Sequence, residues 1–121
     1  MAKASSSTAE NVADYGVALD RSSQLDGYTV SFVTITQTHD LAPMLASLPG
    51  GNCSCPHWGV VTKGRLIVRY ADHEEVIEAG DAFDMAPGHA PEAEAGTEIV
   101  QFSPTEQLRE VEAAMAAAMQ G

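Results

Sequence analysis

Positive charge is scarce in this sequence, which has 6 Lys and Arg residues against 17 Asp and Glu residues and a formal net charge of −11. A nucleic acid needs clustered Lys and Arg to neutralise its phosphates, so we expect no nucleic-acid partner. An anionic membrane surface is disfavoured for the same reason. No apolar run approaches the length of a membrane-spanning helix, so we expect no membrane span.

Cysteine is also rare, with two residues in 121, and residues 1–10 lack the apolar centre of a secretory signal. We therefore expect a cytoplasmic protein with reduced thiols. A chain of this length, in which 45% of the residues are hydrophobic, has enough apolar surface for one core. Residues 1–121 are predicted to form a single domain, with residues 1–10 as a disordered tail.

Short β-strands dominate the middle of the chain. The segment 28–36 is rich in aromatic and β-branched residues that alternate with Thr and Ser, which predicts a strand. Further short apolar segments follow as far as residue 103, with turn residues between them. This regular spacing is typical of an all-β barrel or sandwich, here expected over residues 28–103. Residues 11–27 give only a weak signal, apart from a turn at Asp26-Gly27.

Two helices are expected outside the strands. Asp40 has the character of an N-cap for a short helix over residues 41–48. Ser103, followed by Pro104 and Glu106, forms a capping-box pattern that predicts an amphipathic helix over residues 104–119. We expect this C-terminal helix to pack on the outside of the barrel.

The central block resembles the cupin superfamily, whose second motif reads G-x5-P-x-G-x2-H-x3-N. Gly80 matches its first position, and Pro87-Gly88 follows at the turn, although Ala86 replaces the first proline. Pro91 stands where the motif has histidine, but His89 lies two residues earlier. The resemblance covers about residues 50–103. It implies a cupin jelly-roll barrel, and more narrowly a small single-domain cupin of unassigned role.

The first cupin motif, G-x5-H-x-H-x3,4-E-x6-G, is matched only in part. Gly64 fits its final glycine, and His57 stands at the position of the glutamate. Cys53 takes the place of the second histidine, while Gly51 takes that of the first. The usual set of three histidines and one glutamate is therefore absent.

Four residues are candidates for a metal site. In an extended chain Cys53, Cys55 and His57 point to the same side, which in a cupin is the barrel interior. The resemblance places His89 on the loop that reaches the same cavity. Two thiols and two imidazoles suit a divalent metal, zinc before iron or nickel. We favour a site with His57, His89 and one of the two cysteines over a site that uses all four residues. The alternative is that the cysteines pack as small buried hydrophobic residues and that this cupin has lost its metal.

Two functions remain open from the sequence. The first is a non-catalytic protein that binds or senses a metal ion or small polar molecule, which we favour because the usual ligand set is absent. The second is a metal-dependent enzyme, such as an isomerase or dioxygenase, that acts on a small polar metabolite. Trp58 has the opposite parity to His57, so we expect it on the outside, under a helix or in a homodimer contact. His39 and His73 are expected in solvent, as are Glu92 and Glu94.

Overall fold

The computed structural model describes residues 3–46, 48, 51 and 53–120. It contains ten strands, two α-helices and one 3-10 helix in this part of the chain. Their bounds are η1 Ser6–Thr8, β1 Asn11–Asp14, β2 Ala18–Leu25, β3 Tyr28–Ile35, β4 His39–Asp40, α1 Ala42–Leu45, β5 His57–Lys63, β6 Arg65–Arg69, β7 Glu74–Glu78, β8 Ala82–Met85, β9 Ala90–Ala93, β10 Glu98–Pro104 and α2 Thr105–Gln120.

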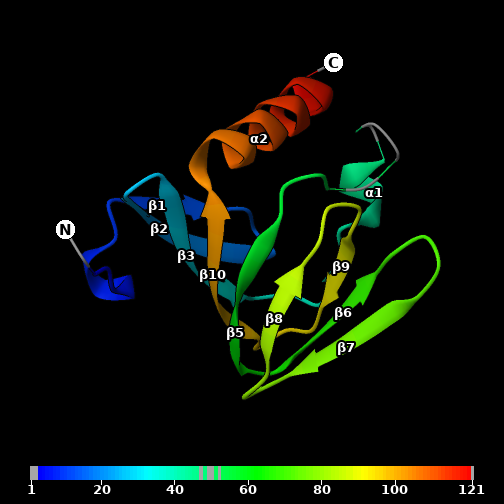
Figure 1. Ribbon diagram of the computed structural model, residues 1–121, viewed down its shortest axis with the longest axis horizontal. Coiled ribbons are helices and arrows are strands. Elements are labelled where there is room, and N and C mark those ends of the chain that lie inside the picture. Colours follow the sequence, from blue (N-terminus) through cyan, green and yellow to red (C-terminus); the bar gives the residue numbers. More distant parts are fainter. Residues whose placement is uncertain (1–2, 47, 49–50, 52, 121) are drawn as a thin grey trace.

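Two antiparallel sheets form the barrel (Figure 1). The larger sheet has the strand order β1-β2-β3-β10-β5-β8, and the smaller has the order β4-β9-β6-β7. Every pairing between these strands is antiparallel. The predicted all-β jelly-roll barrel with two flanking helices is confirmed.

The core lies between the two sheets. Inward positions alternate along each strand, as the pleat of a sheet requires. From the larger sheet they include Val61, Phe83 and Ile99, and from the smaller sheet Leu66 and Val68, all buried. Removing these side chains from water supplies the main driving force for closing one sheet over the other.

The segment 11–27, weak in sequence, forms strands β1 and β2 at one edge of the larger sheet. The inward positions of β2 include Asp20, Ser22 and Gln24, so the strand lacks the apolar alternation by which it would be recognised. The predicted turn at Asp26-Gly27 is confirmed. Both residues have positive φ, of 50° and 86°, as a two-residue β-hairpin requires.

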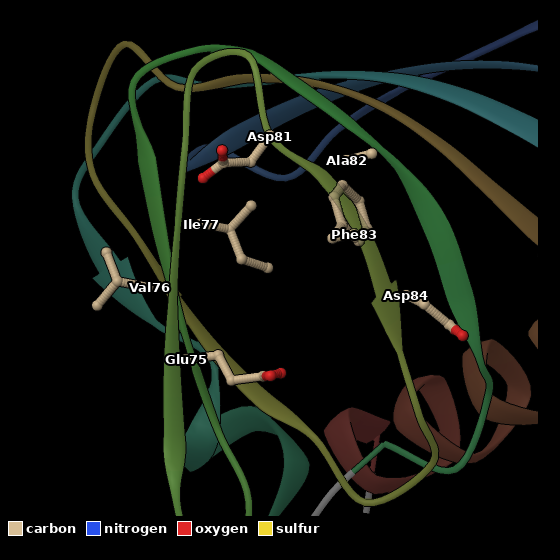
Figure 2. A pocket seen from close by; sticks show the side chains of 7 residues that line it. All are labelled: Glu75, Val76, Ile77, Asp81, Ala82, Phe83 and Asp84. Atoms are coloured by element: carbon tan, nitrogen blue, oxygen red, sulfur yellow. The ribbon is translucent and has the colours of Figure 1, made fainter.

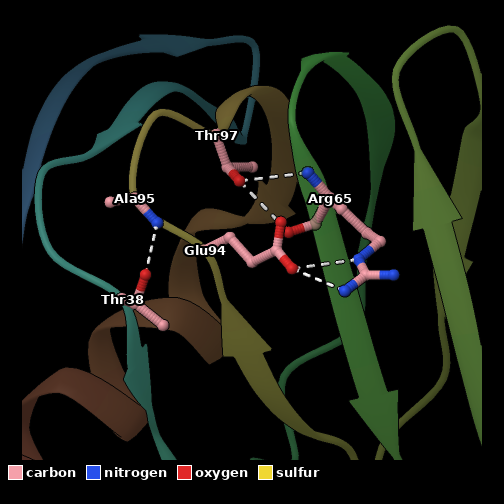
Figure 3. A network of polar contacts seen from close by, with 5 residues as sticks. All are labelled: Thr38, Arg65, Glu94, Ala95 and Thr97. Carbon is pink, nitrogen blue, oxygen red and sulfur yellow. Dashed lines mark hydrogen bonds and ion pairs between the residues drawn. The ribbon is translucent and has the colours of Figure 1, made fainter.

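Gly64 lies where the chain leaves β5 in one sheet and enters β6 in the other. Its φ is +80°, and a Cβ built on it would lie 2.4 Å from Thr97 Oγ1. Thr97 Oγ1 accepts a hydrogen bond from the Arg65 N–H and donates one to the Arg65 carbonyl, both at 3.1 Å (Figure 3). The glycine of the motif is thus needed for close contact at the crossing between sheets.

The first helix is shorter than expected. It was predicted over residues 41–48 with Asp40 as its N-cap, but α1 spans Ala42–Leu45 and Leu41 is the capping residue. Asp40 lies in β4, where its Oδ1 still accepts a hydrogen bond from the Ala42 N–H at 2.8 Å. Residues 47, 49 and 50 lie outside the described part of the chain.

The C-terminal helix α2 is present, but the predicted cap at Ser103 is wrong. Strand β10 continues to Pro104, and the side chain of Ser103 is fully buried on its inward face. Helix α2 packs on the outside of the strands, as expected. It crosses the end of the barrel, where Val111 and Leu108 pack in a cluster with Leu45 of α1 (Figure 1). The side chains of Met115 and Met119 lie outside the described residues.

Candidate metal centre

Cys53 and His57 reach the same end of the barrel from the segment that leads into β5. His57 is the first residue of β5, on its inward side, since it pairs with the buried Met85 of β8. Cys53 forms an isolated antiparallel bridge with His89. The loop before β9 is thereby held beside the segment before β5.

Three of the four predicted ligand residues come together here. The ligand atoms of Cys53, His57 and His89 all lie within 4.8 Å of one another. Cys53 Sγ is 3.8 Å from His57 Nε2, and the two imidazole ring centroids are 4.9 Å apart. Zinc bonds of 2.0–2.3 Å at a tetrahedral angle place two ligand atoms about 3.5 Å apart. One sulfur and two nitrogens at these separations suit a divalent metal ion after small side-chain adjustments.

Each imidazole is oriented by a hydrogen bond at its other nitrogen. His57 Nδ1 lies 2.7 Å from Ser103 Oγ, and His89 Nδ1 lies 2.7 Å from the Ala86 carbonyl oxygen. Such contacts hold a metal-binding histidine in one ring orientation. Ser103 was missed as a site residue because its sequence context is that of a helix cap. Only the pairing of β10 in the sheet shows that it points inward.

The three residues are almost fully buried. Exposed fractions are 1% for His89, 7% for Cys53 and 8% for His57. Burial, followed by the proximity of His89, lowers the pKa of His57 to about 3. Burial likewise lowers the pKa of His89 and raises that of the Cys53 thiol. All three side chains are therefore neutral near pH 7 without a metal, and both imidazoles keep one nitrogen free of a proton.

Cys55 is not part of the group formed by Cys53, His57 and His89, called the trio below. It is fully buried in the apolar cluster with Leu45, Leu48 and Val111, and its Sγ lies 3.5 Å from the Pro56 carbonyl oxygen. Burial, with added repulsion from Cys53 and Glu112, raises the pKa of the Cys55 thiol to about 12. This environment matches the alternative that a cysteine serves as a small hydrophobic residue.

The remaining polar candidates lie away from this site. His73 is exposed and bonds to Asp72, as expected, whereas His39 is half-buried in β4. Glu92 and Glu94 pair with Arg69 and Arg65 respectively on the smaller sheet (Figure 3 shows the Glu94 pair).

Two cavities are present elsewhere. One, of about 260 Å³, opens between the edge strands β7 and β8, where Ile77 and Phe83 face each other across the gap (Figure 2). The other, of about 310 Å³, lies between α2 and the polar inner face of β2 and β3, and it is lined by Asp20, Ser31 and Glu112 among others. Neither of these two cavities is lined by Cys53, His57 or His89.

Comparison with known proteins gives no match to a family model and none to a curated protein. Solved structures do match. An RmlC-like cupin from Shewanella frigidimarina NCIMB 400 is 16% identical, with 84% of this chain and 88% of that chain covered at a TM-score of 0.57. The chain has the cupin fold. A protein of unknown function from Rhizobium leguminosarum bv. viciae 3841 is also 16% identical, covering 85% and 94% at a TM-score of 0.61. KdgF from Halomonas sp. is 18% identical, covering 78% and 86% at a TM-score of 0.52.

Cys53 and His57 hold the positions of two motif residues, and His89 comes from the turn of the second motif. At these identities the likeness shows the fold alone, and reactions vary widely within one fold. Chemistry must therefore be argued from the trio itself. None of the described helices is both long and apolar enough to cross a membrane.

Proposed function

We propose that this small cupin binds one divalent metal ion through Cys53 Sγ, His57 Nε2 and His89 Nε2, as a non-catalytic binding or sensing protein. The supporting observation is the convergence of these three ligand atoms within 4.8 Å, from two separate segments. A thiolate with two imidazoles favours zinc over iron or nickel. Cys55, the fourth predicted ligand, is left out of the proposal because its thiol lies in the apolar cluster.

Burial supports binding rather than turnover. Leu45 of α1 and Val111 of α2 pack in the buried apolar cluster that contains Cys53, and so cover this side of the site. A small polar substrate would have to displace this cover to reach the metal. A protein that only holds or senses the ion needs no such opening.

A metal-dependent enzyme is the second candidate, and one observation favours it. Three protein ligands leave a fourth position of a tetrahedral ion open, as in catalytic zinc sites. The two proposals differ in whether a small ligand can reach that position. With cobalt in place of zinc, azide or imidazole should leave the visible spectrum unchanged in a closed binding site and should shift it in an open catalytic one.

The decisive experiment is a zinc titration of the purified chain, with metal analysis. We expect one zinc per chain for the natural protein and none for His57→Ala. His73→Ala is the matched control, because His73 is exposed and lies outside the trio, and it should bind as the natural protein does. Absence of zinc binding by the natural protein, or equal binding by His57→Ala, would contradict the proposal.

The cytoplasmic location and the lack of a nucleic-acid partner stay predictions from the sequence, as does the homodimer. For the homodimer the relevant surface is the outer face of the larger sheet. Trp58 lies there, with its ring centroid 5.3 Å from that of Tyr28 and 6.5 Å from that of Phe102. Light scattering should give a dimer mass that Trp58→Glu converts to that of a monomer.

A further inference from the structure

The two ring nitrogens of His57 have different partners, and those partners decide which nitrogen carries the hydrogen. Nδ1 lies 2.7 Å from Ser103 Oγ, and Nε2 lies 3.8 Å from Cys53 Sγ. A neutral imidazole has one N–H donor and one acceptor nitrogen. Only the tautomer with hydrogen on Nδ1 leaves Nε2 free to bind a metal.

His89 has no such choice. Its Nδ1 faces the carbonyl oxygen of Ala86 at 2.7 Å, and a carbonyl can only accept. His89 therefore carries its hydrogen on Nδ1, and its Nε2 is ready for a metal before any metal arrives. This ring provides an internal reference for His57.

The hydroxyl of Ser103 can donate or accept, but its surroundings favour donation. Ser103 is fully buried, and within the described chain His57 Nδ1 is the one hydrogen-bond partner of its Oγ. If Nδ1 carried the hydrogen, the hydroxyl hydrogen of Ser103 would be buried without an acceptor, which is costly. A donating Ser103 instead leaves the ring hydrogen on Nε2.

The next hydrogen bonds in the series are consistent with donation from Ser103 to His57. An Nε2–H points at the sulfur of Cys53, which can accept weakly. The Cys53 thiol in turn donates toward the Cys55 carbonyl oxygen at 3.8 Å. Each group in this series then donates one hydrogen bond to the next. The order runs from Ser103 to His57 to Cys53, and it ends at the carbonyl oxygen of Cys55, which can only accept.

We propose that Ser103 holds the metal-free His57 in its Nε2–H tautomer, and that the same hydroxyl becomes the acceptor of an Nδ1–H bond when a metal ion takes Nε2. This inference rests on the proposed metal site. Before binding, His57 is neutral and Cys53 is a thiol. Afterwards His57 is neutral with its hydrogen moved to Nδ1, Cys53 is a thiolate, and one proton has passed to solvent. Ser103 is thus a positioning residue that acts through His57.

The direct test is the tautomer of each histidine, read from nitrogen-15 chemical shifts and long-range nitrogen–hydrogen couplings. In protein stripped with a chelator, we expect His57 with hydrogen on Nε2 and His89 with hydrogen on Nδ1. After zinc is added, both rings should carry hydrogen on Nδ1. A metal-free His57 already in the Nδ1–H form, or a ring that keeps its tautomer when zinc binds, would overturn the inference.

Variants at residue 103 test the role of the hydroxyl. Ser103→Ala should remove the hydrogen-bond signature of His57 Nδ1, and the metal-free ring should no longer be held in the Nε2–H form, because the donor at Nδ1 is gone. Ser103→Thr keeps a hydroxyl and should restore the signature. Ser31→Ala is the matched control, since Ser31 is another buried inward serine of the same sheet. Its His57 signals should not change, and the His89 signals report that each variant is folded.

Failure of the two proposals can be distinguished. If the natural protein binds no zinc, the proposed function and the metal-driven switch both fail, while the metal-free tautomer still decides whether Ser103 sets the state of His57. If zinc binds but Ser103→Ala matches the natural protein in the His57 signals, the metal site stands and the role of Ser103 is refuted.

Discussion

Cys53 and His89 face each other across an antiparallel bridge, in which the Cys53 N–H donates to the His89 carbonyl oxygen at 2.9 Å. A second backbone bond, from the Gly88 N–H to the Cys53 carbonyl oxygen at 2.8 Å, closes the pair. The backbone thus places a sulfur and an imidazole side by side without help from a metal. A site that is partly formed in advance loses less conformational entropy when the ion binds.

The two cysteines should behave differently although they are two residues apart. Cys53→Ala should abolish stoichiometric zinc binding because its sulfur belongs to the trio. Cys55→Ala should keep one zinc per chain and lower the free energy of unfolding by about 1 kcal/mol, through the small space it leaves in the apolar cluster. Zinc titration and urea unfolding of the two variants measure both effects. Loss of zinc in Cys55→Ala would show that the second sulfur is a ligand.

Zinc affinity should depend on pH through Cys53. Its raised pKa means that the thiol keeps its proton near pH 7, and metal binding must remove that proton. The association constant should therefore rise about tenfold per pH unit between pH 6 and pH 8. His57, with its pKa lowered to about 3, is already free of a proton on one nitrogen throughout this range. Competition with a chelator at several pH values gives the slope, and a slope of zero would exclude a thiolate ligand.

Much of the fold could be predicted from local pattern. Strand β3 and helix α2 were recognisable because their residue types or spacing match a strand or helix period over a long segment. The convergence of Cys53, His57 and His89 was expected from strand parity and from the cupin motif positions, and the structure brings these three together. Whether they bind a metal stays a prediction.

The missed features depend on contacts between distant segments. Strand β2 carries polar inward residues because a cavity lies over them, which sequence periodicity does not report. Ser103 has the local pattern of a helix cap, but pairing of β10 with β3 continues past it and turns its side chain toward His57. Cys55 shares the parity of Cys53, yet the chain is not in a regular strand there, so the alternation fails.

Gly64→Ala should strongly destabilise the barrel. A Cβ at this position would lie 2.4 Å from Thr97 Oγ1 and 2.6 Å from Thr97 Cα, and the φ of +80° is strained for any L side chain. We expect a loss of about 2–4 kcal/mol in the free energy of unfolding. Gly80→Ala is the control, because Gly80 has a similar φ of +94° but open space around it. Urea unfolding of both separates the steric effect from backbone strain, and equal losses would refute the close contact.

The last prediction concerns Asp20 of β2, which lines the cavity between α2 and the strands β2 and β3. Burial, followed by the nearby Glu112, raises the pKa of Asp20 from 3.8 to about 6, and Ser31 partly offsets the shift. Its Oδ1 is buried without a hydrogen-bond partner in the described chain. Tyr15 and Arg109 also line this cavity. The surroundings of Asp20 therefore favour its protonated, neutral carboxyl group.

The sign of the effect follows from the raised pKa. The folded protein holds the Asp20 proton more tightly than the unfolded chain, so its contribution to stability is complete below about pH 3.8 and is lost as the pH rises through about 6. Asp20→Asn removes the charge and should stabilise the protein by about 1–2 kcal/mol at pH 7.5, after allowance for solvent screening. Near pH 4 the variant and the natural protein should unfold alike.

Asp84→Asn, which makes the same change at an exposed position of β8, should alter stability by less than about 0.5 kcal/mol at either pH. Urea unfolding at both pH values measures these differences. If the gain in stability of Asp20→Asn over the natural protein is no larger at pH 7.5 than at pH 4, Asp20 is not held in an unfavourable charged state.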